Sequence, residues 1–94
     1  MEPHALVLAD RLSRAAVGDM SVCFELGIAF STGSHGAACD LIEAHKWFNL
    51  AAVHGDEEAS HCRSEVAEDM SARDIAEAQR RARRWLSAFS RKAA

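Results

Sequence analysis

Residues 40–55 read Asp-Leu-Ile-Glu-Ala-His-Lys-Trp-Phe-Asn-Leu-Ala-Ala-Val-His-Gly, and this segment decides the fold. Its small and large apolar residues recur at the three- and four-residue spacing of one helix face, namely Leu41, Ala44, Trp47, Phe48, Ala51 and Ala52. Asp40 is placed to cap the first turn, Glu43 occupies the capping-box position, and Gly55 stands where a left-handed C-terminal residue belongs. The segment therefore predicts a self-capped amphipathic helix, residues 41–54.

The same helical spacing continues toward the N-terminus. Pro3 fits a first turn, and apolar residues then repeat until Gly18, which predicts a helix over residues 3–17. Asp19 is placed to cap a second helix, which ends in the glycine- and hydroxyl-rich loop 31–36. One face of that helix is apolar and consists of Val22, Cys23, Leu26 and Phe30. Gly27 lies inside it, and we expect Trp47 of the following helix to lie against its bare backbone.

Two further helices follow Gly55. Asp56 is placed to cap a fourth helix through about residue 69, with a core face of Ala59, Cys62, Val66 and Met70 and with glutamates outside. Ser71 is placed to cap a fifth helix, whose apolar positions step by three and four. Those positions are Ile75, Ala78, Ala82, Trp85, Leu86 and Phe89. No segment alternates as a strand does, so the sequence predicts an all-α chain of five helices.

The composition is that of one globular domain, residues 1–94, with 49% hydrophobic residues and a net charge of -3. The charge is unevenly distributed. Residues 1–71 carry four basic and twelve acidic side chains, whereas residues 72–94 carry seven basic and two acidic ones. We therefore expect a basic last helix on an acidic body.

Export and membrane insertion are not indicated by this sequence. No run approaches the roughly 20 apolar residues of a membrane span, and the first residues lack the positive flank of a signal peptide. The three cysteines, Cys23, Cys39 and Cys62, are widely spaced and odd in number, which favours reduced thiols. These features predict a cytoplasmic protein without a disulfide.

An internal repeat joins the first half of the chain to the second. Ala15-Ala-Val-Gly-Asp19 returns as Ala51-Ala-Val-His-Gly-Asp56, so the two Gly-Asp pairs are 37 residues apart. The motif between and around the glycines consists of Gly18, Leu26, Gly27, Phe30, Gly33, Asp40, Ala44, Trp47, Ala51, Ala52 and Gly55. This pattern resembles the Sel-one-like repeat family, a branch of the tetratricopeptide-like superfamily.

The resemblance implies an α-α superhelix, or solenoid, of about two and a half helix pairs. Residues 19–55 would be one full repeat, residues 3–17 the second half of a preceding one, and residues 56–91 a divergent terminating repeat. The last segment departs from the pattern at Arg63, Ser64 and Ala67, and the loop before Asp40 is one residue longer than expected. The implied function is a non-enzymatic adaptor that binds another protein or a peptide.

Candidate partner-binding residues follow by analogy with the concave face of that family. They are Phe24, Glu25 and Ile28 on the second helix and His61 and Glu65 on the fourth. An exposed Phe24 would anchor a partner, whereas a buried one would be core between repeats. The arginine stripe of the last helix, with Arg80, Arg81 and Arg84, either pairs with the Glu-rich fourth helix or binds an acidic protein. Because solenoids usually need about three repeats, the first or last helix is also expected either to pair in a homodimer or to dock on a partner.

A small metal- or nucleic-acid-binding regulator is the alternative. His35 with Cys39, or His61 with Cys62, provides metal-ligating side chains, but zinc sites need four converging ligands. The arginine stripe suits phosphates, but the acidic remainder of the chain opposes a duplex. No nucleophile elbow or phosphate loop is present. We therefore predict no catalytic residues, no metal, no cofactor and no membrane or nucleic-acid partner.

Overall fold

The computed structural model describes residues 3–34 and 36–93, with side chains for residues 7–34 and 36–88. All regular structure in these ranges is helical, which confirms the all-α prediction. The elements in chain order are α1 (Pro3–Ala16), the short 3-10 helix η1 (Met20–Val22), α2 (Cys23–Thr32), α3 (Leu41–Val53), α4 (Glu57–Ala67) and α5 (Ala72–Ala93). No helix within the described ranges has the length and apolar content needed to cross a bilayer.

Side-chain caps begin three of the helices where the sequence predicts them. The amide of Glu43 donates to Asp40 Oδ1 at 3.1 Å. The amide of Ala59 donates to Asp56 Oδ1 at 3.0 Å. At α5 the amide of Asp74 donates to Ser71 Oγ at 3.1 Å. Each cap satisfies a backbone N–H that has no partner inside its own helix.

Two local predictions are wrong in detail. Asp19 caps η1 and not an α-helix, because a 3-10 turn precedes α2. The capping box at α3 is not closed, since the Asp40 amide donates to the Phe30 carbonyl oxygen at 2.9 Å. The Glu43 carboxylate instead binds Lys46 and Arg81. The first turn of α3 is thus held by the end of α2 on one side and by α5 on the other.

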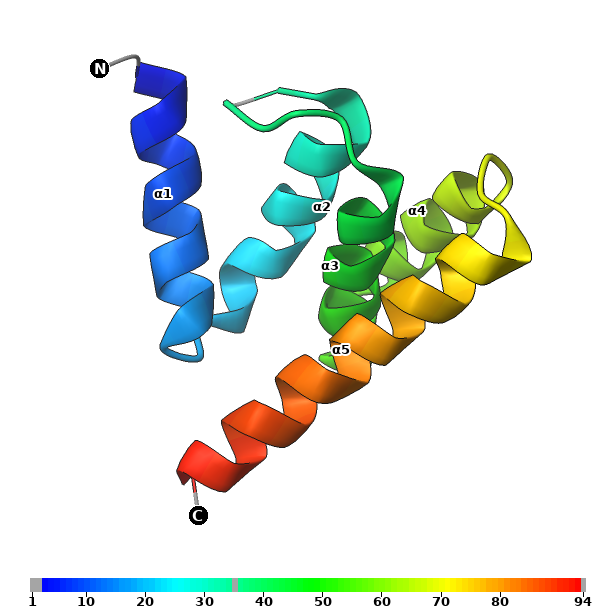
Figure 1. Cartoon of the computed structure of the whole chain (residues 1–94). Helices are drawn as coiled ribbons and strands as arrows, with labels where there is room; N and C mark the ends of the chain where they lie inside the picture. Colours follow the sequence, from blue (N-terminus) through cyan, green and yellow to red (C-terminus); the bar gives the residue numbers. More distant parts are fainter. Residues whose placement is uncertain (1–2, 35, 94) are drawn as a thin grey trace.

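α3 is the central helix of the molecule. Figure 1 shows α2 beside it, α4 behind it and α5 crossing in front of it, and each of these three packs against α3. α1 packs mainly against η1 and α2. The core accordingly lies around α3, with the fully buried large side chains Val22, Cys23, Leu26, Phe48 and Leu50.

The close approach at Gly27 involves Phe48, so the expected contact with Trp47 is wrong. The Phe48 ring occupies the space that a side chain on Gly27 would need. Trp47 is buried on a different face of α3, where its ring meets that of Trp85 edge-on at a centroid distance of 6.3 Å. Trp47, the tryptophan of the repeat motif, therefore belongs to the contact between α3 and α5.

Two arginines of the stripe, Arg80 and Arg81, form ion pairs with α3 or within α5. Arg81 Nη1 lies 2.9 Å from Glu43 Oε2, and Arg81 Nε lies 2.7 Å from Glu77 Oε2. Arg80 also pairs with Glu77. The expected pairing with the Glu-rich fourth helix is absent from the described residues, because α5 packs against α3 and leaves the α4 glutamates facing solvent.

Candidate functional site

An apolar line runs along η1 and α2. Met20, Phe24 and Ile28 are four residues apart in sequence, so they share one side of the helix, and all three are half-buried against the core. The Phe24 ring packs on Phe48 at a centroid distance of 5.8 Å and a 54° interplanar angle. We call these three residues the Phe24 ridge. Phe24 is therefore neither fully exposed nor fully buried, since part of its surface packs in the core and part faces solvent.

A shallow hollow lies on each side of the ridge. The first, of about 200 Å³, lies between α1 and α2 and is lined by Arg11, Phe24, Glu25 and Ile28. The second, of about 240 Å³, is lined by Met20, Ser21, Phe24, Ala51, His54 and Asp56. Because Phe24 lines both hollows, a ligand side chain in either one would touch the same ring.

Carboxylates outnumber cations around the ridge. Arg11 pairs with Glu25, and Arg14 lies between Asp19 at 2.9 Å and Asp10 at 3.7 Å. Hydrogen bonds from the Ser21 side chain and amide lower the pKa of Asp19, and Arg14 lowers it further. Both arginines are thus neutralised by acidic neighbours. Asp56, in the second hollow, has no ion pair within the described part of the chain.

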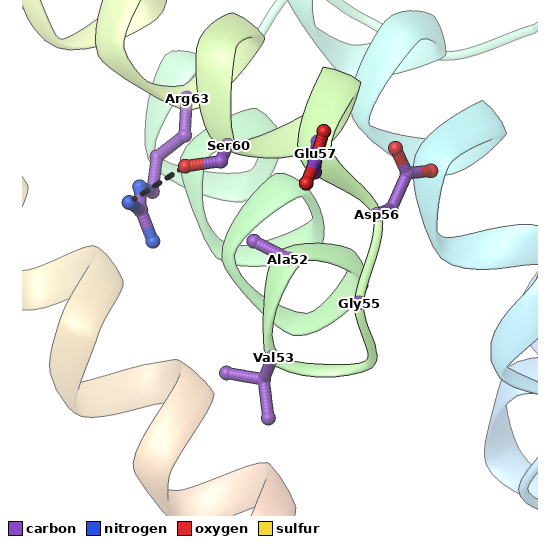
Figure 2. Close-up of a pocket in the computed structure, with 7 residues that line it drawn as sticks. All are labelled: Ala52, Val53, Gly55, Asp56, Glu57, Ser60 and Arg63. Carbon is purple, nitrogen blue, oxygen red and sulfur yellow. Dashed lines mark hydrogen bonds between the residues drawn. The ribbon is translucent and has the colours of Figure 1, made fainter.

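A third hollow, of about 440 Å³, lies at the turn between α3 and α4. Figure 2 shows Arg63 and Ser60 hydrogen-bonded on one side of it, with Asp56 and Glu57 at the start of α4. The Arg63 guanidinium is held at 2.6 Å by Asn49 Oδ1 and at 3.3 Å by Ser60 Oγ. The two nearby carboxylates make this opening unsuited to an anion.

His45 is buried beside that hollow's arginine. Its side chain is 4% exposed, and its Nδ1 has no hydrogen-bond partner among the described residues. Burial lowers the pKa of His45, and the positive charge of Arg63 lowers it further. A neutral imidazole in the core is a structural group and is not available to a ligand at the surface.

The other predicted partner-binding residues lie apart from the ridge. His61 Nε2 is 2.7 Å from Glu65 Oε1 on the exposed side of α4, and neither residue lines a hollow beside the ridge. Arg80 and Arg81 are held by Glu77 and Glu43, whereas Arg84 is exposed. The structure therefore brings Phe24, Glu25 and Ile28 together and separates them from the remaining five candidates.

The metal-ligating candidates that the structure describes do not converge. No three His, Cys, Asp or Glu side chains in the described ranges are grouped as metal ligands would be. His35 lies outside the described residues. Cys39 is exposed, and its thiol donates to the Ser31 carbonyl at 3.6 Å. Cys62 is half-buried on α4. Burial raises the pKa of the Cys23 thiol to about 11, so it is an unreactive core residue.

Six residues that line the two hollows were not predicted from the sequence as partner-binding residues: Arg11, Met20, Ser21, Ala51, His54 and Asp56. Met20 could have been found, because it extends the Phe24 and Ile28 spacing by one step. Arg11 and His54 line the hollows only because α1 and the end of α3 pack beside the ridge. No local pattern marks such residues.

The comparisons with known proteins give no relative. The sequence matches no protein-family model, and no curated protein or solved structure matches it significantly.

Proposed function

We propose that this chain is an interaction module that binds another protein or a peptide along the Phe24 ridge. The observation that carries the proposal is the half-buried apolar line between two hollows, with one aromatic ring shared by both. Such rings are frequent energetic anchors of interfaces, because a partner removes their remaining surface from water at about 25 cal/mol per Å².

The proposed module is a Sel-one-like solenoid fragment centred on residues 19–55. Support comes from the 37-residue repeat and from the burial of small motif residues where helices meet, as at Ala44 and Ala51. Gly27 contributes by letting α2 and α3 approach closely. Residues 56–91 depart from a simple helix pair, since α4 and α5 each pack against α3. The repeat assignment is therefore best supported for α2 and α3.

Binding of a protein or a peptide fits the ridge better than binding of nucleic acid fits α5. Arg80 and Arg81 already form ion pairs with Glu77 and Glu43, so fewer unpaired cations on α5 remain for phosphate groups. The ridge, in contrast, has apolar surface with a shallow hollow of about 200–240 Å³ on each side. We infer binding without chemical conversion.

A peptide-display selection against the full chain tests this proposal. Peptides enriched on the wild type are expected to bind at least about tenfold more weakly to Phe24→Glu, because the new carboxylate must be desolvated at the centre of the contact. Val17→Glu is the matched control, since Val17 is 80% exposed and lies outside both hollows. Equal binding to both variants, each folded by circular dichroism, would contradict the proposal.

A further inference from the structure

α5 is much longer than the helix on which it packs. α5 has 22 residues and α3 has 13, which at about 1.5 Å per residue gives lengths of about 33 and 20 Å. The last fully buried side chain in the described part of α5 is Ala82. Figure 1 shows the C-terminal part of α5 continuing past the end of α3. We call residues 83–93 the overhang.

The overhang is basic and partly apolar. Its sequence holds four cations, Arg83, Arg84, Arg91 and Lys92, and no acidic residue. Arg83 and Arg84 are exposed, and neither has an ion pair with a described residue. Trp85 and Leu86, at its base, are half-buried because they pack against the core of their own molecule, where Trp85 meets the Trp47 ring. The exposed, unpaired arginines are the pattern of a helix that docks on an acidic surface.

The Phe24 ridge provides such a surface. Met20 and Ile28 are eight residues apart, so the ridge extends about 12 Å along the helix, which three turns of the overhang would cover. The acidic groups around it are Asp10, Asp19, Glu25 and Asp56, and Arg11 and Arg14 compensate only two of them. Length and charge therefore agree between the two surfaces.

We propose that the Phe24 ridge binds the overhang of a second copy of this chain. The inference rests on the proposed function, because it assigns an occupant to the same ridge. The exposed face of α4 is a weaker acceptor for the overhang. Its outward residues are charged or small, so a docked helix would gain only screened ion pairs there.

Charge-swapped variants of the full chain test the contact by sedimentation velocity. Variant one carries Glu25→Lys with Ile28→Lys and makes the ridge basic. Variant two carries Arg83→Glu with Arg84→Glu and makes the overhang acidic. The wild type is expected to self-associate with rising concentration, and less so at high salt. Each variant alone is expected to associate at least about tenfold more weakly, because like charges then meet.

An equal mixture of the two variants is expected to associate again. In the mixture both kinds of contact join opposite charges, since the basic ridge meets the acidic overhang and the native ridge meets the native overhang. Restoration would also show that both variants fold. Ser64→Lys with Glu68→Lys is the control, because it adds the same net charge to exposed positions of α4 and should leave association unchanged.

Two results would overturn the inference. One is a wild type that sediments as a monomer at every concentration and at low salt. The other is an association that the α4 control abolishes and the ridge variant does not. Either result leaves the proposed function standing if displayed peptides still require Phe24. Conversely, if displayed peptides no longer required Phe24 but the chain still self-associated through the ridge, the peptide-binding proposal would fail and the self-association proposal would stand.

Discussion

The Phe48 ring of α3 lies against the bare backbone of Gly27 in α2. A Cβ atom added to Gly27 would be 2.9 Å from Phe48 Cγ and closer still to two other ring carbons. Phe48 is 1% exposed and packs within the main core, so its ring cannot move aside without displacing its neighbours. The absence of a side chain at Gly27 therefore sets how closely α2 and α3 approach.

Gly27→Ala is expected to destabilise the fold. Overpacking of this kind costs about 1–3 kcal/mol, and better helix propensity recovers at most about 1 kcal/mol of it. Urea unfolding followed by tryptophan fluorescence measures the change. Gly27→Ala combined with Phe48→Leu should lose less than the two single changes added together, because the smaller side chain makes room. Ser87→Ala, at an exposed position of α5, is the control, and equal stability of both alanine variants would contradict the packing account.

Helices and caps could be predicted from the sequence because the physics that places them is local. Asp40, Asp56 and Ser71 each cap the helix that follows at the expected amide, three residues on. The three- and four-residue spacing of apolar residues likewise predicts Leu26, Ala44 and Ala59 in the core, where the structure has them.

The relations between helices could not be predicted in the same way. The sequence could not show that Phe48, rather than Trp47, fills the space at Gly27, because neighbouring residues on a helix differ by only about 100° in direction. It also could not show that Glu43 turns away from its own helix cap toward Arg81, which is 38 residues distant. The second hollow beside the ridge is missing from the prediction for the same reason, since three separate elements form it.

Glu43→Gln is expected to loosen α5. The carboxylate receives Lys46 Nζ at 3.0 Å and Arg81 Nη1 at 2.9 Å, and the Glu43 side chain is only 20% exposed. Hydrogen bonds to charged groups contribute about 1.5–3 kcal/mol, and partial exposure of Arg81 brings the expected loss to about 1–2 kcal/mol. Urea unfolding measures it, and trypsin cleavage at the α5 arginines should become faster.

The Glu43 carboxylate also makes the stability of the fold depend on pH in acidic solution. Burial raises the pKa of Glu43, but Lys46 and Arg81 outweigh burial, so the folded value lies below 4.5. Its contribution to stability is therefore present above pH 4.5 and is lost as the pH falls through the lower folded value. Glu43→Gln should remove this part of the acid dependence. A variant that keeps the wild-type acid profile would show that other carboxylates cause it.

The three thiols should react with iodoacetamide in the order of their exposure. Cys39 is exposed, Cys62 is half-buried with a pKa raised first by burial and then by nearby carboxylates, and Cys23 is buried. The pKa of about 11 leaves Cys23 about a hundredfold less thiolate than an ordinary thiol of pKa 9.0. Mass spectrometry of tryptic peptides over time measures the order. Denaturant should equalise the three rates, and early labelling of Cys23 in the native protein would contradict its place in the core.

His45 should make the fold less stable in mildly acidic solution. Burial first, and then Arg63, lower the folded pKa of His45 below its unfolded value of 6.5. Between these two values the unfolded chain binds a proton that the folded chain does not, so stability falls as the pH drops below 6.5 and levels off past the folded pKa. Above pH 6.5 the contribution of this group is constant.

His45→Met tests that origin, because it keeps a similar volume and removes both the titrating group and the unpaired Nδ1. Replacing an unsatisfied buried polar group by an apolar one of similar shape is about neutral or stabilising. The variant should therefore match or exceed the wild type above pH 6.5 and lose the decline below it in urea unfolding. His61→Gln, at an exposed position of α4, should keep the decline. If His45→Met keeps the decline, the pH dependence does not arise from His45.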